Sequence, residues 1–269
     1  MKIIDQSVEI ITEPNPLKRI ELVGRVCWKS EHRITEDSAK PFVAGLIKRG
    51  HTSPLEHARV VIPKDHLLFW IIFHEQQVYG IRNRLVVDYD GRTESSIKVN
   101  LRDIHSTLYR ICGDGLNFDD FFNNVESLPN ADDYMTVKFT TDIGMSRELI
   151  RHRQMSFMEL STRYVNYEDG IEFVKPLRYD DNSSLQTGYN EYLSVVEMMY
   201  KDSIKQGLKP QEARAILPLC TKTELYMTGM LSQWKDVFAL RESPAAHPQM
   251  RALMALLREE MKKNNIEVE

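Results

Sequence analysis

The chain has 269 residues, of which 42% are hydrophobic and 28% charged, and its formal net charge is −4. This composition is ordinary for a soluble globular protein, and the negative charge excludes binding of nucleic acid through overall electrostatics. Three scattered cysteines without CxxC spacing indicate a reducing compartment and no structural zinc, so we predict no metal site. No targeting segment is evident, and the longest apolar run, HLLFWIIFH, is too short to span a bilayer. We therefore expect a cytoplasmic protein with neither a membrane nor a nucleic-acid partner.

The first part of the chain predicts two helices and then a strand. Asn15 is a plausible N-cap for the first helix, and Pro16 suits its first position. An apolar stripe at helical spacing over 39–47 predicts the second helix, which Gly50 would end. Residues 58–63 have the pattern of a strand, and the apolar run that follows fits a buried strand or helix.

The polar stretch 75–132 contains the turn signals DYDG and CGDG, and we interpret it as an irregular insertion with some helix. The threonine-rich stretch 133–144 predicts a strand, and MSRELIRHR predicts a helix after it. The remaining predicted elements are a long helix over 185–207, a short helix over 209–218, a strand over 223–230 and helices over 231–241 and 247–263. The long helix is expected to bury one face formed by Leu185, Tyr189, Tyr192, Val196, Met199 and Tyr200.

No repeat or linker divides this pattern. We therefore predict a mixed α/β (α+β) fold in which 1–269 form a single domain carrying the insertion at 75–132. A central antiparallel sheet would be flanked by helices, and the C-terminal half would be rich in helix.

The stretch RHRQMSFMELSTRY at 151–164 gathers cations around hydroxyl groups and one carboxylate. Arg151, His152 and Arg153 cannot all be buried without partners. A solvated helix end is the plain explanation, and a phosphate site is the alternative, because guanidinium groups match phosphate oxygens.

Three other stretches each have an ordinary structural explanation when taken alone. RGHTSPLEH at 49–57 could be a capped loop or a ligand-binding turn. Arg214 stands alone among apolar residues and could simply form an ion pair. Arg241 and His247 lie at a predicted helix end and in the turn after it.

Taken together and in this order, these motifs resemble the flavin-dependent thymidylate synthases. The family signature is RHR, seven residues and then Ser, which Arg151, His152, Arg153 and Ser161 match without a gap. The resemblance implies a mixed α/β fold and a homotetramer whose active sites are shared between subunits. It also implies an FAD enzyme that converts dUMP to dTMP with NADPH and methylenetetrahydrofolate as co-substrates.

The resemblance also implies roles for single residues. Arg241 would be catalytic, because a fixed cation beside the uracil ring stabilises the negative charge that develops there. The implied substrate-binding residues are Glu148, Arg151, Glu159, Ser161, Arg163, Arg214 and Arg241. The implied cofactor-binding residues are His51, Ser53, Glu56, Arg151, His152, Arg153, Glu159, Met230, Asp236 and His247.

The sequence departs from the family pattern at Met158, Met230 and Asp236, where relatives carry other polar side chains. Alternatives therefore stay open. One is transfer of a one-carbon group to another uracil nucleotide such as UMP. Another is a divergent nucleotide-binding homologue with weakened flavin binding. A nucleic-acid-binding module that uses the RHR stretch fits the net charge poorly.

Overall fold

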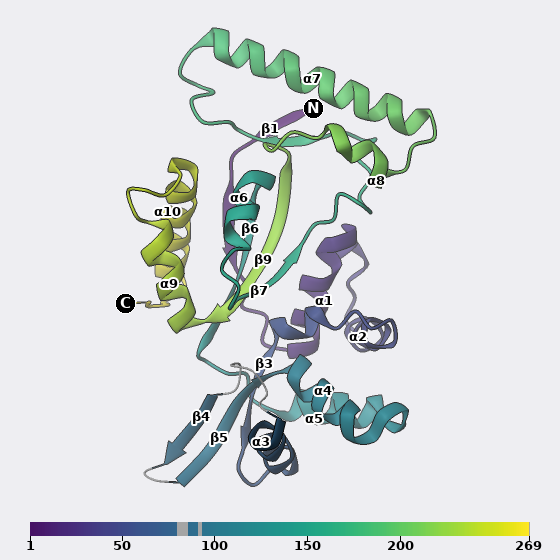
Figure 1. The fold of residues 1–269 in the computed structure, drawn as a ribbon, viewed down its shortest axis with the longest axis vertical. Coiled ribbons are helices and arrows are strands. Elements are labelled where there is room, and N and C mark those ends of the chain that lie inside the picture. Colours follow the sequence, from purple (N-terminus) through teal and green to yellow (C-terminus); the bar gives the residue numbers. More distant parts are fainter. Residues whose placement is uncertain (80–85, 91–92, 269) are drawn as a thin grey trace. The chain divides into compact units, whose positions relative to one another are not determined.

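The computed structural model describes residues 1–79, 86–90 and 93–268 (Figure 1). Two compact units emerge. Unit 1 comprises Met1–Ile11, Arg25–Ser30 and Met135–Glu269, and unit 2 comprises Thr12–Gly24 and Glu31–Tyr134.

Unit 1 is built on a four-stranded sheet in the order β2-β6-β9-β7. The strands are β2 (Ser7–Ile10), β6 (Tyr134–Asp142), β7 (Ser156–Glu159) and β9 (Lys222–Met230). The β2–β6 and β7–β9 pairs are antiparallel. A second, two-stranded sheet pairs β1 (Lys2–Ile4) in parallel with β8 (Glu172–Val174).

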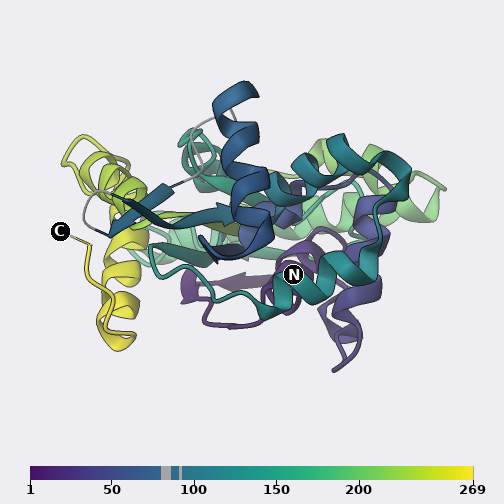
Figure 2. The same ribbon diagram turned by 90° about the horizontal axis from the view of Figure 1, so that it is seen from below.

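Helices cover one face of the larger sheet. These are α6 (Ile143–Leu149), α9 (Leu231–Arg241) and α10 (Pro248–Lys263), and α9 and α10 lie side by side (Figures 1 and 2). Alternate residues of β6 and β9 point toward them, so Val137, Phe139 and Met227 share one apolar core with Trp234 and Leu253.

The smaller sheet of unit 1 is covered by α7 (Ser183–Lys205) together with α8 (Pro210–Ala213) and the 3₁₀ helix η5 (Arg214–Ile216). Leu193, Val196 and Tyr200 of α7 pack with Ile171 and Phe173 around β8. Ala213, Ile216 and Leu217 belong to the same cluster, so it holds the segment that precedes β9 against β8 and α7. One further 3₁₀ helix of unit 1 is η1 (Val26–Trp28).

Unit 2 has a three-stranded antiparallel sheet in the order β3-β5-β4. Its strands are β3 (Arg59–Pro63), β4 (Val86–Asp90) and β5 (Thr93–Asn100). Its helices are α1 (Pro16–Arg25, with Arg25 assigned to unit 1), α2 (Ala39–Lys48), α3 (Leu67–Tyr79), α4 (Leu101–Cys112) and α5 (Phe118–Ser127). Three 3₁₀ helices connect them, namely η2 (Glu31–Arg33), η3 (Ser53–His57) and η4 (Gly113–Gly115).

The predicted mixed α/β class, with antiparallel pairing and flanking helices, is confirmed. Asn15 caps α1 as predicted, since its Oδ1 accepts hydrogen bonds from the backbone N–H groups of Leu17 and Lys18 at 2.9 and 3.0 Å. The apolar run HLLFWIIFH lies in α3 and is therefore helical. The boundary of a single domain with an insertion at 75–132 stays a prediction.

The predicted irregular insertion with some helix is right about helix in 75–132, since α4 and α5 lie there, but the described part is more regular than predicted because β5 also occupies it. Asn100 and Asn117 cap the two helices by accepting the backbone N–H groups of Asp103 and Asp119, both at 2.9 Å. These N-caps were readable in the sequence, but the turn signals around them outweighed them. Residues 80–85 and 91–92 of this stretch lie outside the described residues.

The predicted buried face of α7 is also partly wrong. Leu185, Tyr192 and Met199 are 39%, 54% and 49% exposed, respectively. The buried residues are instead Leu193, Val196, Glu197 and Tyr200. The chain offers two apolar stripes on this helix, and sequence spacing does not say which one packs against β8. We call the exposed residues Leu185, Tyr192, Val195, Met198 and Met199 the α7 apolar strip.

No helix in the described ranges is long and apolar enough to cross a membrane.

Candidate functional site

Three predicted site residues that are distant in sequence meet at the end of α9. Arg241, the last residue of that helix, donates from Nε to His152 Nε2 at 2.9 Å. Its Nη1 and Nη2 donate to Glu148 Oε2 at 2.9 Å and to the Glu148 backbone carbonyl at 2.6 Å. Arg241 is thus held in one orientation by three hydrogen bonds.

These contacts form because α6 ends at Leu149, before the cationic run. The run therefore lies in a turn and not on a helix as predicted, with His152 N–H donating to the Leu149 carbonyl at 3.1 Å. The turn brings His152 back over Glu148, which still belongs to α6.

His152 is the neutral member of this group. Burial lowers the pKa of His152, and the charge of Arg241 lowers it further, while Asp236 acts in the opposite direction. A neutral imidazole that accepts at Nε2 carries its proton on Nδ1. At neutral pH the group therefore presents one fixed guanidinium charge, which Glu148 partly balances.

A cavity of about 550 Å³ opens beside this group, within the size range of small-molecule sites. It is lined by Arg151, His152, Arg153, Gln154, Met155, Gln233, Asp236, Val237, Ala239 and Leu240. The exposed Arg151 and Arg153 of the turn thus stand next to a wall from α9 that is apolar at Val237, Ala239 and Leu240 and also carries Gln233 and Asp236. Such a surface can take a flat ring on the wall and an anionic group at the arginines.

Gly229 allows the turn to pack against β9. A Cβ atom at this position would lie 2.1 Å from Met155 Sδ, so a larger residue here would force the Met155 side chain to move. Gln233 then connects the two segments, because its Oε1 accepts the Met230 N–H at 2.8 Å and its Nε2 donates to the Gln154 carbonyl at 3.2 Å. Gln233 was not among the residues predicted from the sequence. Gln233 lies three residues after Met230, the N-cap of α9, and glutamine is common at this position because its side chain can accept the N-cap N–H. This spacing could have revealed it.

A second cationic group surrounds the turn after β7. Ser161 Oγ accepts the Arg163 N–H at 3.3 Å, and Arg163 Nε donates to Gln211 Oε1 at 3.1 Å. Arg214 Nη1 donates to Thr162 Oγ1 at 3.3 Å. Ser161, Arg163 and Arg214 are therefore neighbours, as the phosphate interpretation requires, and both guanidinium groups are exposed.

Glu159 lies at the end of β7, between hydroxyl and thiol groups. Its carboxylate accepts a hydrogen bond from Thr223 Oγ1 at 2.9 Å, and its carbonyl accepts Cys27 S–H at 3.2 Å. Burial, followed by the charge of Glu159, raises the pKa of Cys27 to about 11, so the thiol stays protonated. Met158 is buried and its sulfur lies 3.0 Å from Cys27 Sγ, which gives this departure from the family pattern a packing role.

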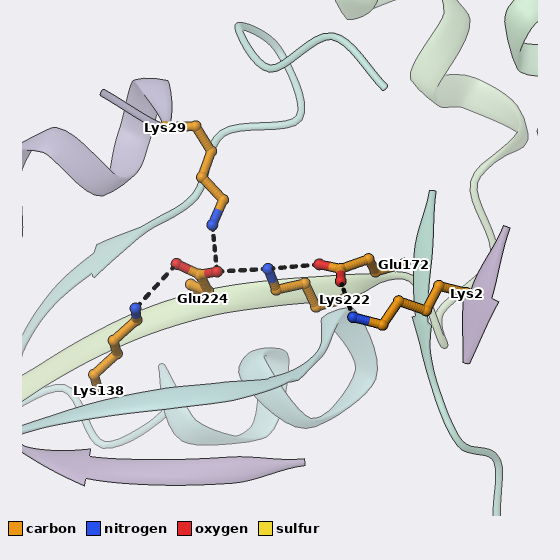
Figure 3. A network of polar contacts seen from close by, with 6 residues as sticks. All are labelled: Lys2, Lys29, Lys138, Glu172, Lys222 and Glu224. Carbon is orange, nitrogen blue, oxygen red and sulfur yellow. Dashed lines mark hydrogen bonds and ion pairs between the residues drawn. The ribbon is translucent and has the colours of Figure 1, made fainter. Parts of the chain in front are cut away.

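One face of β9 carries Thr223, which contacts Glu159, and the opposite face carries a network of lysines and carboxylates (Figure 3). Buried Glu224 contacts Lys29, Lys222 at 2.5 Å and Lys138 at 3.3 Å. Lys222 continues to Glu172 at 3.0 Å. This network was not predicted from the sequence, although the alternation in TKTELYMTG places Lys222 and Glu224 on one face of a strand.

The lysines keep Glu224 ionised. Burial by itself would raise the pKa of this carboxyl, but hydrogen bonds from Lys222 and Lys29 outweigh burial and bring the pKa down to about 2. The network therefore ties β6, β8 and β9 together and fixes the strand that also carries Thr223.

Unit 2 holds the predicted cofactor residues of the first motif. His51 and Ser53 are exposed in the turn after α2 and at the start of η3, where Gly50 has φ +72. Glu56 is nearly buried and forms an ion pair with Arg102 of α4. Arg102 had no signal in the sequence, since it comes from the stretch that we interpreted as an irregular insertion.

One predicted residue stands apart in unit 1. His247 is exposed at the N-cap of α10, where its Nδ1 accepts the Gln249 N–H at 3.3 Å, and it does not line the cavity beside Arg241. The roles assigned to single site residues stay predictions.

Comparison with known proteins identifies the family of the chain. The family model described as "Thymidylate synthase complementing protein" matches residues 132–264. The flavin-dependent thymidylate synthase of Pyrococcus furiosus is 30% identical over 189 residues, which cover 67% of this chain and 72% of that protein. The enzymes of that name from Synechocystis sp. and Mycobacterium bovis are 30% and 33% identical over 132 and 128 residues. These two matches cover 44% and 41% of this chain, and 61% and 51% of the relatives.

Among solved structures, a UMP/dUMP methylase from Streptomyces cacaoi with bound 5-Br UMP aligns with a TM-score of 0.47 and 18% identity. That alignment covers 99% of this chain and 92% of the methylase.

The sequence relatives define the class as an enzyme of the methyltransferase type that depends on a flavin. The chain belongs to the flavin-dependent thymidylate synthase family. The predicted family and enzyme class are therefore confirmed, and so is the need for a flavin.

Proposed function

We propose that this protein methylates dUMP to dTMP reductively, with FAD as cofactor and with NADPH and methylenetetrahydrofolate as co-substrates. One observation carries the proposal. Arg241 keeps a fixed positive charge between neutral His152 and Glu148, next to the cavity lined by the RHR turn. Family membership supplies the reaction type, and this group supplies a means of promoting it.

The uracil C5 atom is a poor nucleophile, so the reaction needs negative charge in the ring. A guanidinium that is held in place before the reaction stabilises that charge without having to reorient. Arg241 fits this role because arginine stays protonated and because its partners fix its plane. When bound, the flavin supplies the hydride, and the protein binds and polarises the nucleotide.

Ser161 is proposed to bind the nucleotide and not to attack it. A serine nucleophile needs a neighbouring base. In the part of the chain that the structure describes, the partner of Ser161 Oγ is the Arg163 backbone N–H and not a histidine. The hydroxyl and the guanidinium groups of Arg163 and Arg214 suit a phosphate, and Glu148, Arg151 and Glu159 are proposed to contact the rest of the nucleotide.

The residues that line the cavity fit a flavin. Val237, Ala239 and Leu240 offer an apolar surface for the ring system, and Arg151 and Arg153 offer donors for anionic oxygens. The proposed cofactor residues are the set predicted above, with His152, Met230 and Asp236 in unit 1 and His51, Ser53 and Glu56 in unit 2. His247 is retained in that set as a prediction only.

A homotetramer with shared active sites is part of the proposal. The α7 apolar strip supports association, because neighbouring large apolar residues exposed on one helix typically mark a protein interface. A cytoplasmic location likewise stays a prediction.

The test is a turnover assay on the purified protein after incubation with FAD and removal of the excess. A flavin absorption spectrum that shifts on addition of dUMP, followed by dTMP formation with NADPH and methylenetetrahydrofolate, would support the proposal. Faster methylation of UMP than of dUMP would favour the alternative substrate. Nucleotide binding with no retained flavin and no product would favour the divergent binding homologue, and would contradict the proposed reaction.

A further inference from the structure

Unit 2 contains a second cavity, of about 530 Å³, that none of the proposed site residues lines. The end of α2 and the turn after it form one side, and α4, η4 and the start of α5 form the other. Its lining residues are Ile47, Lys48, Gly50, Thr52, His105, Tyr109, Gly113, Asp114, Leu116 and Phe118. Its volume is that of a site for a small molecule.

A buried histidine in this lining lacks a partner. His105 is 7% exposed, and its Nε2 has no hydrogen-bond partner among the residues that the structure describes. Burial lowers the pKa of His105, so the ring is neutral at pH 7. An unsatisfied buried polar atom is destabilising, and native structures rarely leave one without a partner.

Aromatic rings surround this histidine. Tyr109 stacks on it with ring centroids 5.9 Å apart and an angle of 19° between the planes. Phe121 meets it edge-on at 6.0 Å. Phe118 and Leu116 extend the apolar lining of the cavity. A flat ring can therefore find stacking partners here.

The cavity also has a cation available. Lys48 Nζ lies 5.8 Å from the centroid of the Phe118 ring, and it forms no ion pair within the described ranges. The carboxylate in the lining, Asp114, already accepts a hydrogen bond from Tyr109 Oη at 3.1 Å. Lys48 is thus the group that can bind a negative charge on a ligand.

Two glycines in the lining have left-handed backbone conformations that favour glycine. Gly50 and Gly113 have φ +72 and +57, conformations that L side chains rarely adopt. A Cβ atom at either position would have no neighbour within 4 Å, so the space beside each glycine is free.

We propose that this cavity binds a planar aromatic anion, with its ring against Tyr109 and Phe118 and its acidic group at Lys48. Gly50 and Thr52 flank His51, so an occupant would also restrain the turn that the proposed function assigns to the cofactor. That consequence rests on the proposed function, whereas the binding itself does not.

The test is calorimetric titration of the full chain with indole-3-carboxylate, a bicyclic aromatic anion that the cavity can hold. We expect saturable binding of one molecule per chain, and binding of the neutral indole-3-carboxamide at least tenfold more weakly. Lys48→Met should weaken binding of the carboxylate at least tenfold, while Lys262→Met, at an exposed lysine of α10 outside the lining, should leave it unchanged.

Leu116→Trp fills the cavity and should abolish binding, with thermal unfolding as a check that the variant is folded. Absence of binding at millimolar probe would overturn the proposal. Binding that survives both Leu116→Trp and Lys48→Met would overturn it as well, since the probe would then lie elsewhere. Because the readout is binding of a probe that is neither nucleotide nor flavin, its failure is distinguishable from failure of the proposed methylation.

Discussion

Glu224→Gln should destabilise the protein in a way that depends on pH. The Glu224 side chain is 5% exposed and contacts Lys29, Lys138 and Lys222. Glutamine keeps the shape but removes the charge, so three lysines lose the carboxylate that they share. Removing one partner from a buried charge pair typically costs about 3–5 kcal/mol.

The lowered pKa of Glu224 gives a second measure of how much this carboxylate contributes to the free energy of unfolding. Lowering the pKa of Glu224 from 4.5 to about 2 corresponds to about 3 kcal/mol of stability at pH 7. Because the folded-state pKa is the lower one, this contribution is fully present above the unfolded value of 4.5. It is lost as the pH falls through about 2, and only about 1 kcal/mol should remain at pH 3.

Urea denaturation of the parent protein and of Glu224→Gln, at pH 7 and at the lowest pH where both are folded, measures this difference. The gap in the free energy of unfolding should be about 3 kcal/mol at pH 7 and should narrow as the pH falls. Glu172→Gln is the matched control, because that carboxylate is more than a third exposed and such pairs contribute about 1 kcal/mol or less. A gap below 1 kcal/mol at pH 7, or one that does not change with pH, would refute the argument.

Three further changes test the site itself. Arg241→Ala should lower turnover at least about a hundredfold, while shifting the melting temperature by only a few degrees. Equal losses of activity and stability would contradict a catalytic role. The control is Arg251→Ala, at an exposed arginine on α10. Arg151→Ala should raise the dUMP dissociation constant about tenfold in a titration, and an unchanged constant would remove Arg151 from the nucleotide site. Met230→Asn should raise the free energy of unfolding by about 1 kcal/mol, because position 230 is the N-cap of α9 and asparagine is favoured there; a lower melting temperature would show that the methionine side chain matters more for packing.

Much of the fold was predictable from local patterns. Residues close together in the chain were enough to predict several elements. These are the helices α1 and α2 with their caps and apolar stripes, the strands β3, β6 and β9, and the helices α9 and α10. The insertion was misread because DYDG and CGDG were weighted above the N-caps Asn100 and Asn117. The burial of α7 was misread because its two apolar stripes differ only in what they pack against, which no local pattern contains.

The site was predictable in membership but not in geometry. The ordered motifs pointed to Glu148, His152 and Arg241, yet nothing in the sequence says that the guanidinium bonds to an imidazole. That contact depends on where α6 ends and where α9 ends, and both ends are set by tertiary packing. The supporting residues Gln233, Thr223 and Glu224 were missed because each acts through a neighbour and none belongs to a recognisable motif.

Side chains of β9 alternate between its two faces, so mutation can separate two roles of this strand. One role is to orient Glu159, and the other is to hold the lysine network. Thr223 points to one face and holds Glu159, and Glu224 points to the other and holds the lysines. Thr223→Val keeps the shape and removes only the hydroxyl, so we expect a loss of about 1 kcal/mol of stability and a larger effect on nucleotide binding, because the Glu159 carboxylate is no longer held. Glu224→Gln should do the reverse, lowering stability most and leaving the dUMP dissociation constant nearly unchanged at temperatures where the variant is folded. If both variants weakened nucleotide binding in proportion to their loss of stability, Glu159 would be sensitive only to the integrity of the strand, and its specific orientation by Thr223 would be refuted.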